Sequence, residues 1–189
     1  RLVPRALAVV EESLDPRTHL PRPSPDYWEK RTGVLTLGTA APVLAGLRSA
    51  HRIWTDDGEA ALAMEAQQAA DRLQAAIEAE FGPTYTRYAH GTERDAATAF
   101  LLAPFQPAAL DGAGEACHAS LEPMLRPAGG LAPGASWGEQ SLSWTPQTSL
   151  YALAAAHNGQ PQMALEWLSW LDAHRTPLGA IPEKVSPAG

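Results

Sequence analysis

The sequence predicts an all-α protein, a single domain over residues 1–189 with about seven helices in antiparallel succession. Three observations support this prediction. Apolar residues recur at helical spacing through most of the chain, segments that favour strands are few, and capping or Pro-Gly signals separate the periodic stretches. The chain has 189 residues, of which 45% are hydrophobic, so it is long enough to bury a substantial core.

The first half of the chain predicts three helices. The first covers residues 2–13, and the second runs from about residue 37 to residue 54. Pro42 lies near the start of this second helix or kinks it. The acidic, glycine-containing stretch 56–59 signals the start of a third helix, which has the clearest apolar stripe in the chain and ends before Gly82-Pro83.

The second half predicts four more helices, one of them short. Residues 92–95, Thr-Glu-Arg-Asp, resemble a capping box before the short helix at 96–102. A weaker helix containing two glycines spans roughly residues 107–125. The helix over 145–158 has Thr-Pro at its start and Asn-Gly at its end, both good boundary signals. A last helix runs from residue 161 to about residue 175.

Charge and composition exclude several classes of function. The formal net charge of -7 argues against a nucleic-acid partner, which needs clustered Lys and Arg. Since no run of about 18 apolar residues occurs, no membrane span is expected. Cys117 is the only cysteine, and the six histidines lack metal-binding spacing, so we expect neither a disulfide nor a metal, and no cofactor. The opening Arg1-Leu2-Val3 looks like mid-protein sequence, which suggests a piece of a longer protein and leaves the compartment open.

The long connections carry the aromatic residues and two notable acids. Residues 15–34 form a proline-rich loop that contains Asp26-Tyr27-Trp28-Glu29, and the last loop contains Ile181-Pro182-Glu183-Lys184. Long loops of this kind are typically functional or disordered. The short connections look like plain turns, so we expect one functional rim and one structural rim.

Two interpretations of Glu29 are open. It can be an ordinary exposed carboxylate that pairs with Lys30 or Arg31, and the sequence is about as consistent with this interpretation as with a catalytic one. Alternatively, Tyr27 and Trp28 offer apolar surface that favours its protonated form, and a protonated Glu beside a Trp is suited to act as general acid on a leaving oxygen. Trp28 could also stack on a sugar ring.

Glu183 has the same ambiguity, because Lys184 can simply neutralise it. On a functional rim it could instead activate water as general base. Inverting glycosidases hold their two carboxyl groups roughly 6.5–9.5 Å apart to leave room for that water. Asp26 could accept hydrogen bonds from sugar hydroxyls, and Trp137 and Trp144 could line sugar subsites, although core packing is the more common role for any single Trp.

At these residues the chain resembles the enzymes of glycoside hydrolase family 15, which include glucoamylase, glucodextranase and trehalase-like members. Residues 26–29 look like the Asp-Leu-Trp-Glu segment of the family, whose Glu is the general acid. Residues 181–185 look like the segment that carries the general base. Residues 94–97 and 143–150 fit the helix starts expected between them, and Trp144 would match a Trp that borders the sugar pocket.

The resemblance implies an (α/α)6 toroid, of which about seven helices would form the later, incomplete part. It implies hydrolysis of terminal α-linked glucose with inversion, with Glu29 as general acid and Glu183 as general base. We expect the substrate to be bound by Asp26, Tyr27, Trp28, Trp137 and Trp144. The expected partners are an oligo- or polysaccharide and either the remainder of the toroid or a second copy of the chain. The competing hypothesis is a non-catalytic helical scaffold that binds a glycan or a protein through its aromatic loops.

Overall fold

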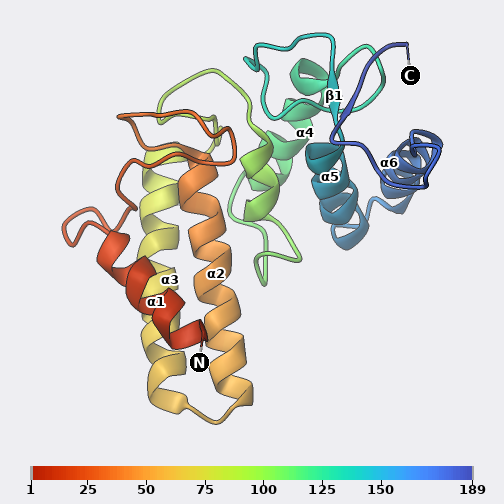
Figure 1. Ribbon diagram of the computed structural model, residues 1–189. Helices are drawn as coiled ribbons and strands as arrows, with labels where there is room; N and C mark the ends of the chain where they lie inside the picture. The colour runs from red at the N-terminus through yellow and green to blue at the C-terminus, as the bar shows by residue number, and fades with distance from the viewer. Residues whose placement is uncertain (1, 189) are drawn as a thin grey trace.

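The computed structural model describes residues 2–188 and is mostly helical (Figure 1). The predicted all-α fold is confirmed, while the predicted domain limits, Arg1 and Gly189, lie outside the described residues. The helices are α1 (Leu2–Ser13), α2 (Leu37–Asp56), α3 (Ala60–Phe81), the short 3-10 helix η1 (Ala96–Leu101), α4 (Ala113–Met124), α5 (Thr145–His157) and α6 (Pro161–Ala173). The two short strands are β1 (Ser143–Trp144) and β2 (Lys184–Val185), which pair antiparallel.

Helix boundaries differ from the prediction at two places. The helix α4 begins at Ala113 rather than near residue 107, because Gly112 at its start has a left-handed φ of 73° that a helix cannot include. The predicted capping box at 92–95 does not form in full at the start of the short helix η1. Its cap is the Asp95 side chain alone, which accepts a 2.9 Å hydrogen bond from the backbone N–H of Ala97.

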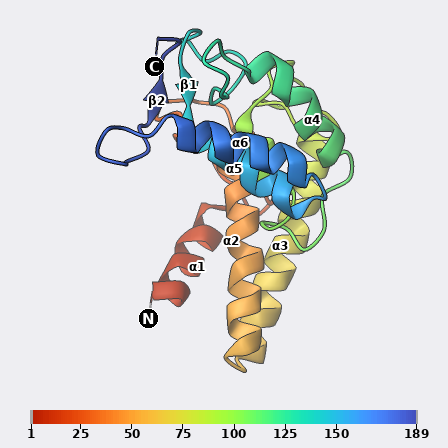
Figure 2. The same ribbon diagram turned by 90° about the vertical axis from the view of Figure 1, so that its right-hand side faces the viewer.

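The helices pack as successive pairs. Helix α2 packs on α3, η1 packs on α4, and α5 packs on α6, while η1 also contacts both α2 and α5. Figure 2 shows α6 lying alongside α5, with the α2–α3 pair extending away from them. The core that joins the pairs is aliphatic, and its fully enclosed members include Leu37, Leu44, Leu73, Leu101 and Met124.

The long connections gather at one end of the helices. Residues 14–36, 82–95 and 125–142 all lie at the upper end in Figure 1, where β1 and the C-terminal segment are also found. The turn at 57–59 lies at the lower end of α2 and α3, and the turn at 158–160 follows the lower end of α5. Loops that are far apart in the sequence meet at the upper end, as the backbone bridges Thr36–Tyr88 and Asp95–Gly134 show.

Candidate functional site

The segment from Asp26 to Glu29 forms a tight turn that Asp26 closes with its own groups. Its carbonyl oxygen accepts the backbone N–H of Glu29 at 2.8 Å, and its Oδ1 accepts the backbone N–H of Trp28 at 2.9 Å. This arrangement is an Asx turn, which Asp forms readily. Glu29 itself has a φ of 56°, a left-handed conformation that residues other than Gly and Asn seldom adopt, and its side chain is exposed. The turn thus displays Glu29 at the loop surface in a strained conformation.

A buried ion network lies behind this turn. Nη2 of Arg87 lies 2.9 Å from Oδ2 of Asp26, and Nη1 of Arg87 lies 3.0 Å from Oδ2 of Asp95. Both carboxylate side chains are 0% exposed and the arginine side chain is 2% exposed. Charges this deeply buried are tolerated only when they are paired and hydrogen-bonded. The hydroxyl of Thr36 meets that requirement in part, because it donates to Oδ2 of Asp26 at 2.7 Å.

Tyr27 completes the ion network from the other side. Its hydroxyl donates to Oδ1 of Asp95 and accepts the backbone N–H of Ala97 at 3.1 Å. Burial raises the pKa of Asp95, although Tyr27, the Ala97 amide and Arg87 all favour its charged form. Burial and the neighbouring Asp95 also raise the pKa of Tyr27 well above its ordinary value, so the hydroxyl stays a neutral donor. We use the term ion network below for Arg87, Asp26, Asp95 and Tyr27.

Three tryptophans from three separate positions in the chain form a continuous row. The ring centroids of Trp28 and Trp137 are 4.8 Å apart, those of Trp137 and Trp144 are 5.1 Å apart, and both contacts are edge-to-face with an interplanar angle of 80°. Edge-to-face contact is a favoured geometry for aromatic pairs. The guanidinium of Arg87 lies 3.6 Å from the Trp28 ring centroid, so the row is anchored on the ion network. We call these three side chains the indole row.

The loop that carries Glu183 joins the indole row at its far end. Strand β2 pairs with β1 so that Lys184 is opposite Trp144, and the backbone N–H of Thr145 donates to the carbonyl oxygen of Glu183 at 3.0 Å. The Glu183 side chain is exposed, as is that of Glu29. The loops that carry Glu29 and Glu183 therefore adjoin the two outer members of the indole row, Trp28 and Trp144, although the two loops are far apart in the sequence.

Two lysines, each following one of these acids, lie over the indole row. Nζ of Lys30 is 4.6 Å from the Trp137 ring centroid, and Nζ of Lys184 is 4.3 Å from that of Trp144. Lys184 also forms a 3.1 Å ion pair with Glu139. The hydrogen bond from Lys184 lowers the pKa of Glu139, so this exposed acid remains ionised and balances part of the local positive charge.

The structure gives protein partners to the polar groups of Asp26 and Tyr27, two residues expected to bind sugar. The oxygens of Asp26 accept hydrogen bonds from Arg87, Thr36 and the Trp28 amide, and the side chain is fully buried. The hydroxyl of Tyr27 is likewise used by Asp95 and Ala97. Both residues therefore support the turn in this structure. Burial also leaves little ring surface on Trp28 and Trp144, which are 7% and 8% exposed, whereas Trp137 between them is half-buried.

Arg87 is the important residue that sequence reasoning missed. In the sequence it is one arginine between Thr86 and Tyr88, and its carboxylate partners lie 61 and 8 residues away. The available signal was indirect. If the loop with Tyr27 and Trp28 packs on the core, the carboxylate of Asp26 is buried with it and needs a cationic partner. Sequence spacing alone does not identify which of the 14 basic residues supplies it.

Close approach of the backbone to Trp28 requires a glycine at position 134. A Cβ on Gly134 would lie 2.5 Å from Cζ2 of Trp28, a ring that Arg87 and Trp137 hold from other sides. We expect Gly134→Ala to lower the free energy of unfolding by about 1–3 kcal/mol, the usual cost of overpacking. Urea unfolding followed by circular dichroism measures this change.

The control for this substitution is Gly138→Ala in the same loop. No atom lies within 4 Å of a Cβ built at Gly138, so its substitution should leave the unfolding free energy almost unchanged. Equal stabilities of the two variants would contradict the tight packing of residue 134 on Trp28.

Two hollows flank helix α5. The larger has a volume of about 640 Å³ and lies between the Asp26–Tyr27 segment, the start of α2, and α5; its lining includes Pro42, Phe100 and Leu153. It is mostly apolar, and Leu153 is 41% exposed. Asp26 and Tyr27 of the turn belong to the lining of this hollow.

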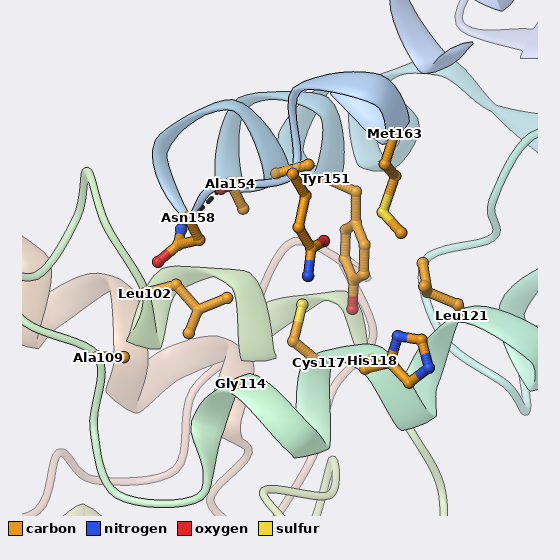
Figure 3. A pocket seen from close by; sticks show the side chains of 12 residues that line it. Leu102, Ala109, Gly114, Cys117, His118, Leu121, Tyr151, Ala154, Asn158 and Met163 are labelled. Carbon is orange, nitrogen blue, oxygen red and sulfur yellow. Dashed lines mark hydrogen bonds between the residues drawn. The ribbon is translucent and has the colours of Figure 1, made fainter. Parts of the chain in front are cut away.

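The smaller hollow, of about 190 Å³, lies between α4 and α5 (Figure 3). In Figure 3 the ring of Tyr151 extends from α5 toward Cys117 on α4, and its hydroxyl bonds the hydroxyl of Ser120. Burial raises the pKa of the Cys117 thiol to about 11, and it raises the pKa of Tyr151 well above its ordinary value. The buried hydroxyls of Tyr151 and Ser120 thus satisfy each other within the interface between α4 and α5.

Buried tyrosines should make the protein sensitive to alkali. Tyr27 and Tyr151 have folded-state pKa values above their unfolded ones, so their stabilising contribution is complete below about pH 10 and is lost as pH rises further. We expect the loss of each tyrosine's contribution to lower the free energy of unfolding by about 1.4 kcal/mol per pH unit in that range. Urea unfolding between pH 8 and pH 11 measures the slope, and Tyr151→Phe should reduce it. An unchanged slope in that variant would contradict the prediction.

Within residues 2–188, no group of three or more His, Cys, Asp and Glu side chains is arranged to hold a metal ion. The helices of the same range include none with the length and apolar character needed to cross a bilayer.

Comparison with known proteins gives a likeness of fold. No family model and no curated protein matches the chain. A glutamate-to-alanine variant of a glycosidase in complex with glucose matches with a TM-score of 0.74 at 20% identity, over 88% of this chain and 47% of that one. A tyrosine-to-phenylalanine variant (TM-score 0.74, 21% identity) and a wild-type glycosidase (0.71, 20%) match over the same shares.

The chain therefore has an all-helical fold like that found in these glycosidases. It spans about half the length of the glycosidases that it matches. At this level of identity the likeness concerns the fold, so the chemistry of this chain has to be argued from its own residues.

Proposed function

We propose that this chain carries the catalytic carboxylates of an inverting glycoside hydrolase that acts on terminal α-linked glucose. The observation that carries the proposal is the indole row, which links the loop of Glu29 to the loop of Glu183. Glu29 and Glu183 are both exposed on these loops, and glycoside hydrolysis requires a pair of carboxyl groups that flank the scissile bond. The likeness in fold to glycosidases supports the same conclusion.

In the proposed mechanism Glu29 is the general acid. It donates its proton to the glycosidic oxygen as the bond from that oxygen to the anomeric carbon breaks, and the leaving sugar departs as a neutral alcohol. Glu183 is the general base. It takes a proton from a water molecule whose oxygen attacks the anomeric carbon from the opposite face, so that α-linked glucose is released as the β-anomer.

The tryptophans would form the floor of the sugar site. The half-buried ring of Trp137 is the most accessible of the indole row, and Trp28 and Trp144 fix its position from both sides. Aromatic faces suit the apolar surface of a pyranose ring. We assign the direct sugar contact to Trp137, and assign Asp26 and Tyr27 to support of the turn.

The decisive experiment follows the product. The full-length protein is incubated with maltose, dextran oligomers or trehalose, and the anomeric protons of released glucose are observed by NMR before mutarotation. We expect β-glucose to appear first from at least one substrate. The leaving glucose appears as the α-anomer from trehalose and as its existing anomeric mixture from maltose, so only α-glucose in excess of that contribution would contradict inversion. Release from none of these substrates would contradict the proposed activity.

A non-catalytic helical scaffold that binds a glycan or a protein through its aromatic loops is the second candidate. It is favoured by the burial of Trp28 and Trp144 and by the use of Asp26 inside the ion network, which leave few free groups for a substrate. Titration with maltose oligomers distinguishes the two functions. A change in tryptophan fluorescence without any released glucose would support the scaffold.

A further inference from the structure

Arg87 contacts three groups through different parts of one planar side chain. Its two terminal nitrogens pair with Asp26 and Asp95, and its guanidinium carbon lies 3.6 Å from the ring centroid of Trp28. Arginine can combine a rigid two-pronged pairing with stacking on an aromatic face, whereas lysine offers a single point charge. The three partners of Arg87 thus depend on the shape of its side chain as well as on its charge.

The backbone of Arg87 is itself held firmly. Its N–H donates to the carbonyl oxygen of Glu93 at 2.9 Å, and its carbonyl oxygen accepts the N–H of Leu37, the first residue of α2, also at 2.9 Å. Asp95 on the far side of the guanidinium caps η1. Arg87 therefore connects the turn to two helix starts, which are rigid references for positioning a reactive group.

The turn that Arg87 holds determines the position of Glu29. Asp26 accepts the N–H groups of both Trp28 and Glu29, so movement of Asp26 would release both. The left-handed φ of 56° at Glu29 persists only while its surroundings over-determine it. Without the fixed arginine we expect this residue to relax toward ordinary backbone angles.

We propose that Arg87 is a positioning residue that holds the Asp26–Glu29 turn so that Glu29 can deliver its proton to the leaving oxygen. This inference rests on the proposed function and goes beyond it by assigning a role to a residue that does not touch the substrate. It predicts that loss of Arg87 impairs protonation of the leaving group more than it impairs the protein as a whole.

The test uses Arg87→Lys in the full-length protein, since lysine keeps the buried charge and allows folding. The matched control is Arg126→Lys. Arg126 is also buried and donates to the carbonyl oxygens of Gly134 and Ala135, beside Trp28, but has no carboxylate partner among its described hydrogen bonds. Both variants are compared for hydrolysis of maltose and of dinitrophenyl α-glucoside, whose leaving group needs no protonation.

We expect Arg87→Lys to lower kcat for maltose about 100-fold, the usual effect of misplacing a reacting group by about 1 Å. The loss for the dinitrophenyl glucoside should be much smaller, and Arg126→Lys should affect both substrates equally. Equal losses for both substrates in Arg87→Lys would overturn the positioning role while the proposed function stands.

Amide hydrogen exchange provides a readout that is independent of activity. The N–H groups of Trp28 and Glu29 should exchange faster in Arg87→Lys than in Arg126→Lys, since only the first variant loosens the turn. Unchanged exchange at these two amides would overturn the inference. If the wild-type protein hydrolyses no glucoside, the proposed function fails, and faster exchange would still establish the structural hold of Arg87 while removing its catalytic purpose.

Discussion

Glu29→Gln in the full-length protein should lower the turnover of maltose by roughly 100- to 10,000-fold, the range for loss of a general acid or base. Glu183→Gln should cause a loss of similar size. The physical reason is that an amide can neither donate the proton that the leaving oxygen needs nor accept one from water. Steady-state rates of glucose release measure both effects.

Leaving-group dependence separates the two roles. Glu29→Gln should keep most of its activity on dinitrophenyl α-glucoside, because that leaving group departs without protonation. Glu183→Gln should lose activity on both substrates, because attack by water still needs a base. The control is Glu139→Gln, an exposed acid near the same indole row that pairs with Lys184. Near-normal rates in Glu29→Gln or Glu183→Gln would refute the assignment of that residue.

Asp95→Ala should lower the free energy of unfolding by about 3–5 kcal/mol, the usual cost of removing one partner of a buried ion pair. Arg87 would lose one of its two counter-charges, the hydroxyl of Tyr27 would lose its acceptor, and η1 would lose its cap. Urea unfolding followed by circular dichroism measures the difference.

The matched control is Asp71→Ala. Asp71 also pairs with an arginine, Arg48 at 2.8 Å, but its side chain is 56% exposed. Exposed pairs of this kind contribute about 1 kcal/mol or less. If Asp95→Ala lost no more stability than Asp71→Ala, the ion network would contribute no more to the free energy of unfolding than an exposed ion pair does.

The two predictions concern different links between structure and function. The carboxylates Glu29 and Glu183 are exposed and should affect rate with little effect on stability. Asp95 is buried and should affect stability first. A variant survey that measures both quantities would therefore separate the reactive groups from the framework that holds them.

Most of the helices could be predicted because their signals are local. Apolar periodicity, Pro42 near a helix start and the Asn158-Gly159 stop all act within a few residues, and the structure places α2, α3, α5 and α6 close to the predicted ranges. The start of α4 could not be predicted. The composition of residues 107–112 favours a helix, but the left-handed φ of Gly112 delays the start of the helix to Ala113.

The sequence by itself determined that this protein is helical, that its long loops carry aromatic residues and acids, and which two glutamates deserve a test. Only the tertiary structure decided that Asp26 faces inward to Arg87, and that Trp137 joins Trp28 to Trp144. The physical reason is one of range. Helix formation is governed by neighbours along the chain, whereas the partner of a buried charge or ring depends on how the helix pairs pack, which no local pattern records.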